Sequence, residues 1–185
     1  SQLSGEQSPD KGRIKFTGRD ITSLSMPARA ALGLARSFQI TSIFSDFSAL
    51  DNVALAVQAH AGHSFHFWRP ANKAATLRGP ALHALERIGL GKRADEPAAN
   101  LSHGEQRQLE IAMALATEPA VMLLDEPMAG MGRDETANMV EILQGLKSRH
   151  TIVLSEHDMD AVFALADRIT VLVYGRAIAT GRPMA

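Results

Sequence analysis

The sequence predicts an α/β fold, with a parallel sheet covered by helices on both faces and a helical lobe inserted into the core. Short apolar runs at 120–124 and 151–155 are typical of buried strands, and stretches with helical periodicity alternate with them. Residues 40–100 interrupt this alternation with helices alone, which indicates the inserted lobe. A chain of 185 residues is long enough for one substantial core.

The composition is that of an ordinary soluble protein, with 45% hydrophobic and 21% charged residues and a formal charge of −1. This charge gives no overall attraction to nucleic acid, so we expect no nucleic-acid partner. The sequence contains no cysteine, which excludes a disulfide framework and thiolate metal sites. No apolar run approaches the roughly 18–20 residues that span a bilayer, and no secretory signal is visible.

The elements are predicted in order along the chain. Residues 12–22 are short, β-prone and punctuated by glycine, which predicts a small antiparallel hairpin. From about 48 to 95 the pattern is helical, with Leu82, Leu85 and Ile88 forming one apolar stripe.

The second half alternates helices and strands. The predicted elements are a helix at 101–116, a strand at 120–124, a helix with Met139, Ile142, Leu143 and Leu146 on one face, a strand at 151–155, a short helix at about 158–166, and two strands within 168–181.

Two adjacent carboxylates, Asp125 and Glu126, follow the apolar strand at 120–124. An aspartate in this position is typical of a residue that holds Mg²⁺ for a nucleotide phosphate, and the neighbouring glutamate could orient or deprotonate an attacking water. The alternative is that both acids only terminate the strand in a solvated turn.

The segment "LSHGEQ" begins the helix at 101–116. Ser102 and Glu105 have the spacing of a capping box, in which each side chain satisfies a free backbone N–H. A helix start that also contains Gly104 can bind an anion such as phosphate. The two interpretations are compatible.

Two further polar residues lie where a nucleotide site could use them. His157 follows the strand at 151–155, so it should share the carboxyl edge of the sheet with Glu126 and could hydrogen-bond a phosphate or the attacking water. Gln39 lies between the core and the helical lobe and could contact Mg²⁺ or water. The alternative for each is a solvated loop side chain.

The segment "HAGHSFHFW" raises two other hypotheses. The spacing of His60, His63 and His66 makes a metal site conceivable, although no carboxylate stands among them. The aromatic residues of the same segment could form an exposed interface or a buried satellite core.

The order and spacing of these motifs resemble the ATPase domain of ATP-binding cassette (ABC) transporters over essentially the whole chain. The resemblance is carried by "GLARSFQ", "LSHGEQRQLEIAMALA", "LLDEPMAGMG", "EHDMDAVFALADRITVL" and "YGRAIATG". The chain is most similar to the ATPases of branched-chain amino acid importers, and the urea and amide importers have similar ATPases.

The resemblance implies a role for each matching residue. Gln39 would be the Q-loop glutamine, and residues 129–132 would form the D-loop. Ser102, His103, Gly104 and Glu105 would form the signature motif. Asp125 would be the Walker B aspartate, Glu126 the catalytic carboxylate, and His157 the switch histidine. His103, Glu105 and Gly132 depart from the commoner family pattern.

The resemblance also implies a P-loop NTPase-like ABC ATPase core, truncated at its N-terminus, with an inserted helical subdomain and a small antiparallel β element. The expected parts are a partial core with the Q-loop (1–39), the helical subdomain (40–100), and the signature helix with Walker B and the rest of the core (101–185). The Walker A pattern G-x-x-x-x-G-K-[ST] is absent from the 185 residues, so we expect this polypeptide alone to be inactive.

By resemblance, the complete subunit would be an ATPase that uses ATP and Mg²⁺ to drive import of branched-chain amino acids or related small polar solutes. Its partners would be transmembrane permease subunits, a second ATPase subunit and, indirectly, a solute-binding protein. It would be cytoplasmic, on the inner face of the cell membrane. The alternatives are an ABC ATPase of another transporter class and a non-catalytic module that pairs with a permease or a sister ATPase.

Overall fold

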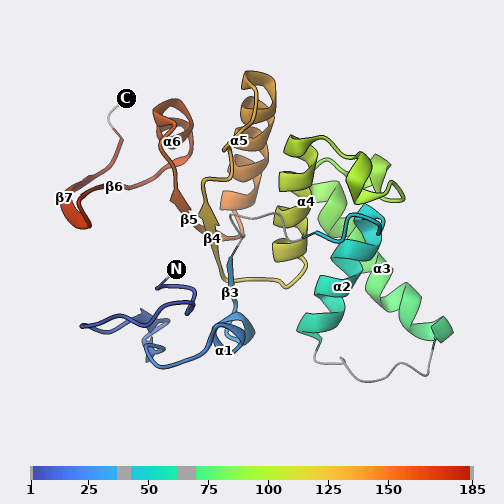
Figure 1. Ribbon diagram of the computed structural model, residues 1–185, viewed down its shortest axis with the longest axis horizontal. Helices are drawn as coiled ribbons and strands as arrows, with labels where there is room; N and C mark the ends of the chain where they lie inside the picture. The colour runs from blue at the N-terminus through green and yellow to red at the C-terminus, as the bar shows by residue number, and fades with distance from the viewer. Residues whose placement is uncertain (1, 37–42, 62–69, 184–185) are drawn as a thin grey trace.

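A three-stranded parallel sheet lies at the centre of the fold (Figure 1). The computed structural model describes residues 2–36, 43–61 and 70–183, with the backbone alone for 70–75. The strands β3 (Leu34–Arg36), β4 (Val121–Asp125) and β5 (Thr151–Ser155) are hydrogen-bonded in the order β3-β4-β5. All carboxyl ends of a parallel sheet lie at one edge, so the residues that follow β4 and β5 are neighbours.

Helices cover one face of this sheet. Met122 and Leu124 of β4 are 0% and 2% exposed and belong to one apolar core with Met139 and Leu143 of helix α5 (Arg133–Lys147). Helix α4 (His103–Leu115) packs beside α5 and links the sheet to the helical lobe. These are the helices and the amphipathic stripe that the sequence predicts.

The opposite face of β5 is open in the described part of the chain, so the prediction that both faces are covered is wrong there. Thr151, Val153 and Ser155 are exposed, and Val153 retains 45% of its accessible surface. An apolar run indicates a strand, but a helix must be present to bury its second face.

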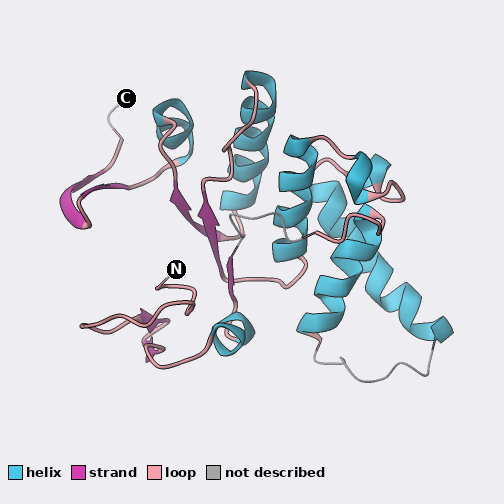
Figure 2. Cartoon of the chain, viewed as in Figure 1, coloured by secondary structure: helices cyan, strands magenta, loops and turns pink. Residues whose placement is uncertain are grey.

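The helical lobe consists of α2 (Ala49–His60), α3 (Pro70–Arg87) and the short 3₁₀ helices η1 (Gly91–Arg93) and η2 (Ala98–Asn100). Its helices lie together with α4 on one side of the sheet (Figure 2). Leu85 and Ile88 are fully buried as predicted, whereas Leu82 is 37% exposed. Ala81 takes the inward position instead, because residues 81, 85 and 88 repeat at helical spacing.

Two antiparallel hairpins flank the parallel sheet. Strands β1 (Lys15–Phe16) and β2 (Arg19–Asp20) form the predicted N-terminal hairpin. After helix α6 (Met159–Leu165), strands β6 (Ile169–Val173) and β7 (Arg176–Gly181) form a hairpin that stands apart from the sheet (Figure 1). Tyr174 and Gly175 have φ of 49° and 74°, as a tight two-residue hairpin turn requires.

Helix α1 (Met26–Ala31) carries Arg29, the largest fully buried side chain among the described residues. Its guanidinium donates to four carbonyl oxygens, those of Gln2, Leu3, Thr22 and Leu24, at 2.7–3.0 Å. These bonds compensate for the burial of the charge and tie the N-terminal segment to α1, which immediately precedes β3. In the described ranges, no helix combines the length and apolarity needed to cross a membrane.

Candidate active site

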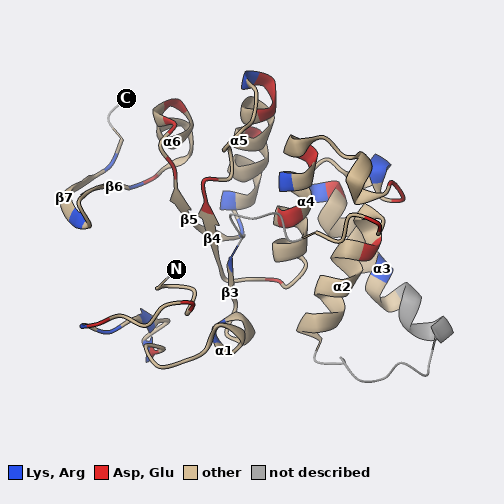
Figure 3. Cartoon of the chain, viewed as in Figure 1, with Lys and Arg blue, Asp and Glu red and all other residues tan. Residues whose placement is uncertain are grey.

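The carboxyl ends of β4 and β5 bring two of the predicted site residues together. Asp125 ends β4 opposite Ser155 of β5, and the backbone N–H of Glu126 donates to the Ser155 carbonyl at 2.9 Å. His157 Nδ1 lies 3.8 Å from Glu126 Oε1. Acidic residues gather in the loops at this edge of the sheet (Figure 3). A carboxylate and an imidazole therefore face one another beyond the two strands.

Glu126 has a backbone conformation that is rare for its residue type. Its φ is +47°, in the left-handed region that is disfavoured for residues with a Cβ. The conformation is held from both sides, because its N–H is bonded to Ser155 and its carbonyl accepts from Ala129 at 3.1 Å. Strained backbone of this kind clusters at functional sites.

A third carboxylate, that of Glu156, lies close to Glu126 and His157. The sequence reasoning missed its role. The Glu156 side chain is only 1% exposed. Its Oε1 accepts from the N–H of Met128 at 3.1 Å, and its Oε2 accepts from the N–H groups of His157 and Asp158 at 2.9 and 3.4 Å. The His157 Nδ1 is 3.6 Å from the same Oε2. Glu156 thus joins the loop after β4 to the loop after β5.

A sequence signal for the burial of Glu156 does exist. The even-numbered residues Ile152 and Leu154 of β5 turn toward the core, and Glu156 continues the same alternation. Glu156 therefore lies on the side of the strand that faces the core. An acid in such a position is expected to be hydrogen-bonded, because an unpaired buried charge is costly.

Arg36 pairs with Asp125 at the end of β4 and with Glu6 of the N-terminal segment. Its NH2 lies 3.3 Å from Asp125 Oδ2, and its NH1 pairs with Glu6 and donates to Ser4 Oγ at 3.2 Å. The side chains of Arg36 and Asp125 are 12% and 33% exposed. The partly exposed Asp125 carboxylate fits the hard-ligand preference of Mg²⁺, which is commonly bound through one or two carboxylates together with substrate phosphates.

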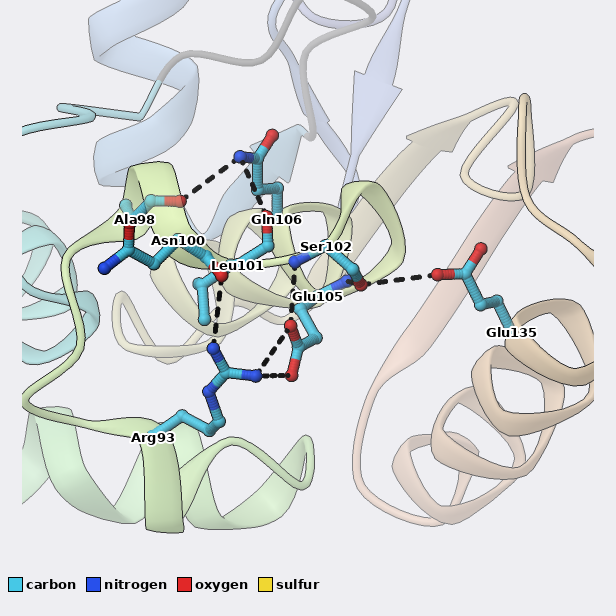
Figure 4. Close-up of polar contacts among 8 residues, drawn as sticks. All are labelled: Arg93, Ala98, Asn100, Leu101, Ser102, Glu105, Gln106 and Glu135. Carbon is cyan, nitrogen blue, oxygen red and sulfur yellow. Dashed lines mark hydrogen bonds and ion pairs between the residues drawn. The ribbon is translucent and has the colours of Figure 1, made fainter.

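The start of α4 forms a second cluster (Figure 4). The Glu105 N–H donates to Ser102 Oγ at 3.2 Å, and the Ser102 N–H donates to Glu105 Oε2 at 2.8 Å, which confirms the predicted capping box. Arg93 pairs with Glu105 Oε1 at 2.8 Å. Arg93 and Glu105 thus fix the helix start, while the Ser102 hydroxyl hydrogen remains available to donate outward.

That hydroxyl donates to Glu135, a residue in the first turn of α5 that the sequence reasoning also missed (Figure 4). The Ser102 Oγ to Glu135 Oε1 distance is 3.3 Å, and Glu135 Oε2 accepts from the Gly132 N–H at 3.2 Å. A Cβ at Gly104 would lie 2.7 Å from Glu135 Oε1, so the absence of a side chain there lets the carboxylate approach. A polar pocket of about 200 Å³ surrounds these groups.

His103 connects the second cluster to the loop that follows Glu126. A Cβ added to Gly130 would lie 3.3 Å from His103 Cε1, and Gly130 has a φ of +78°. Glycine is therefore favoured at position 130 for both space and backbone conformation. The segment 126–135 therefore runs from the first cluster to the second.

Several predicted residues lie outside the described part of the chain. Gln39 is one, and His63 and His66 of the metal hypothesis are two others, as are Phe65, Phe67 and Trp68 of the aromatic segment. Within the residues that the structure describes, no group of three or more His, Cys, Asp or Glu side chains is arranged to hold a metal ion.

Comparisons with known proteins agree on one family. The family model described as "ABC transporter" matches residues 1–129. The high-affinity branched-chain amino acid transport ATP-binding proteins BraF of Pseudomonas aeruginosa and LivG of Escherichia coli K12 are each 34% identical, over 98% of this chain and 74% of their own lengths. The methionine import ATP-binding protein MetN of Rhodopseudomonas palustris is also 34% identical, over 97% of this chain and 47% of its own length.

Solved structures give the same result for the fold. MJ1267, an ATP-binding cassette of an ABC transporter, superposes with a TM-score of 0.84 at 28% identity, over 98% of this chain and 74% of that one. The protein cbiO1 from Clostridium perfringens, part of the ABC transporter complex cbiONQ, superposes with a TM-score of 0.81 at 28% identity, over 98% of this chain and 70% of that one.

Proposed function

Because the chain belongs to the ABC transporter family of ATP-binding subunits, we propose that it is the ATP-hydrolysing part of an ABC importer. The observation that carries this proposal is the pairing of Glu126 and His157, whose Oε1 and Nδ1 atoms lie 3.8 Å apart at the carboxyl ends of adjacent parallel strands.

The proposed chemistry assigns one task to each side chain. Glu126 orients the attacking water and accepts its proton, and His157 donates a hydrogen bond to the terminal phosphate or to that water. Asp125, with Gln39, would hold Mg²⁺, which when bound neutralises charge on the phosphates. Before the metal binds, Arg36 holds the Asp125 carboxylate in place.

The residues at the start of α4 serve as the signature motif in this proposal. Ser102, His103, Gly104 and Glu105 form the N-terminus of a 13-residue helix, where backbone N–H groups and the helix dipole favour a phosphate. They would contact the ATP held by a second ATPase subunit, so the active assembly is a dimer. His103 lies beside Gly130 of the loop at 129–132, so in such a dimer this loop would join the residues that serve one ATP site to those that serve the other.

The proposed transported solutes are branched-chain amino acids or related small polar solutes, which the relatives BraF and LivG support. Import of a different solute is the second candidate, which the equal identity to MetN supports. The partners are transmembrane permease subunits and, indirectly, a solute-binding protein, and the subunit acts at the cytoplasmic face of the membrane. Identification of the copurifying permease distinguishes the two candidates.

We propose a role for each of the three parts expected from the sequence. Residues 1–39 and 101–185 contribute to the ATPase core, and residues 40–100 form the helical subdomain that meets the permease. We further propose that these 185 residues alone bind ATP weakly and do not hydrolyse it, because they contain no G-x-x-x-x-G-K-[ST].

The test of the proposed function is Glu126→Gln in the full-length protein encoded by the gene. The amide keeps the size of the side chain but cannot accept the proton, so turnover should fall by about 10²–10⁴-fold, the usual contribution of a general base. ATP binding should remain intact, because Glu126 acts on the water rather than on the nucleotide. Steady-state phosphate release and equilibrium ATP binding measure the two quantities.

Glu141→Gln is the matched control, since Glu141 is an exposed glutamate on α5. This variant should hydrolyse ATP at the unaltered rate. Near-normal turnover by Glu126→Gln would remove Glu126 from its proposed role, and absence of ATPase activity in the unmodified full-length protein would refute the proposed function.

A further inference from the structure

We propose that Glu156 is a positioning residue for ATP hydrolysis, which sets the position of His157 relative to Glu126. This inference rests on the proposed function and names a part of the same site that the family motifs leave out. Glu156 acts through the backbone of the two loops, and its own carboxylate is buried.

The contacts of Glu156 divide between the two loops. One carboxylate oxygen accepts from the N–H of Met128, two residues after Glu126, at 3.1 Å. The other accepts from the N–H groups of His157 and Asp158 at 2.9 and 3.4 Å. A single planar group thus sets the separation between the two loops.

This link begins where the sheet ends. The parallel pairing of β4 with β5 extends to Asp125 and Ser155, and the next backbone bond runs from Glu126 N to Ser155 O at 2.9 Å. Beyond that bond the chains diverge into loops, and the Glu156 carboxylate joins them. The bonds from N–H groups to an ionised acceptor are stronger than neutral ones, and burial strengthens them further.

The geometry leaves the His157 imidazole itself free to hydrogen-bond a phosphate or a water. Its Nδ1 is 3.6 Å from Glu156 Oε2 and 3.8 Å from Glu126 Oε1, both beyond ordinary hydrogen-bond distance, and its side chain is 77% exposed. Glu156 therefore fixes the backbone from which the imidazole projects, and the ring can still turn toward a phosphate. Glu156→Gln removes one acceptor oxygen and places an NH₂ group against backbone N–H donors on one side.

The experiment uses the full-length protein and compares Glu156→Gln and Glu156→Asp with the unmodified enzyme. Glu156→Gln should lower kcat by about 10- to 100-fold, since displacement of a catalytic group by about 1 Å can cost this much. The KM for ATP should change by less than about twofold, because the residues that bind the nucleotide are untouched. Glu156→Asp keeps the charge but is one methylene shorter and cannot span both loops, so it should show the same loss of kcat.

A double-mutant cycle with His157→Ala separates positioning from general loop stability. On the His157→Ala background, Glu156→Gln should lower kcat by less than about threefold, because the group that it positions is already absent. Glu110→Gln is the matched control, since Glu110 is another buried glutamate, paired with Arg107 on α4. It should leave kcat within about twofold of the unmodified enzyme, and thermal unfolding monitors the folded fraction of each variant.

The failure of this inference is distinguishable from failure of the proposed function. If the unmodified protein hydrolyses ATP and Glu126→Gln abolishes hydrolysis, but folded Glu156→Gln keeps its kcat, the positioning role is overturned and the proposed function stands. An equal loss of kcat from Glu156→Gln with and without His157 also overturns it. If the unmodified protein lacks ATPase activity, both are overturned.

Discussion

Replacing Glu126 with glycine should stabilise the protein while it abolishes hydrolysis. The reason is the backbone of Glu126, whose φ of +47° is held by hydrogen bonds from both sides of the turn. Pro127 follows directly and restricts the conformation of the preceding residue further. Glycine adopts positive φ without the clash between Cβ and the following carbonyl oxygen, so the substitution relieves strain at the position where the proposed chemistry needs a carboxylate.

The expected gain follows from two opposing free energies. The left-handed conformation costs a residue with a Cβ about 1–2 kcal/mol. Glycine loses about 0.4–1 kcal/mol more backbone entropy on folding than a residue with a side chain. The difference leaves a net stabilisation of about 0.8 kcal/mol relative to Glu126→Gln, which corresponds to a rise in Tm of about 2–3 °C for a protein of this size.

The assay compares the free energy of unfolding of Glu126→Gly with that of Glu126→Gln, measured by urea denaturation without nucleotide. Glu126→Gln is the reference because it removes the same charge and keeps the strained backbone. Glu118 provides a matched control outside the site, since it has the same φ of +47° in an exposed turn. Glu118→Gly should gain a similar amount over Glu118→Gln and keep full ATPase activity. If Glu126→Gly is no more stable than Glu126→Gln while Glu118→Gly gains as expected, the argument from strain at Glu126 is refuted.

Two further predictions concern nucleotide binding and pH. Titration calorimetry of the 185-residue polypeptide with Mg²⁺-ATP should detect weak binding or none, and a low-micromolar or tighter Kd would contradict the proposal. Hydrogen bonds from the hydroxyl of Thr22, and to a lesser extent from its backbone N–H, lower the pKa of exposed Asp20 from its ordinary value. The ionised carboxylate therefore stabilises the folded protein at pH values above its unfolded pKa, and this stabilisation is lost as the pH falls through the folded pKa. Thr22→Val should raise the pKa of Asp20 in an NMR titration, and an unchanged pKa would exclude the hydroxyl as the main cause.

Local elements could be predicted because their causes lie close together in the sequence. The capping box of Ser102 and Glu105 depends on residues three apart, and a helix start satisfies such a pair within one turn. The hairpin around Tyr174 and Gly175 likewise depends on one turn. The meeting of Glu126 with His157 was predictable for a different reason, since parallel strands place their carboxyl ends at one edge.

The errors arose where burial depends on a distant partner. Apolar β5 was predicted to be covered on both faces, yet Val153 is 45% exposed, because hydrophobicity does not specify which helix covers which face. The sequence predicts Leu82 on the inward stripe of α3, but Ala81 is buried there instead. Both residues are apolar, and the angle between the helix and its neighbours decides which is buried.

The sequence by itself determined the order of the elements, the motifs at their ends and the family to which those motifs belong. The reason is that each of these signals consists of a few consecutive residues. The tertiary structure alone decided the polar partners of the candidate site residues. Arg36 reaches Asp125 across 89 positions, and Ser102 meets Glu135 across 33. The bond from the Met128 N–H to the Glu156 carboxylate, across 28 positions, is a third such contact. Contacts of this kind depend on how strands and helices pack in space. Periodicity and capping patterns relate only residues a few positions apart, so they do not reveal partners that are far apart in the sequence.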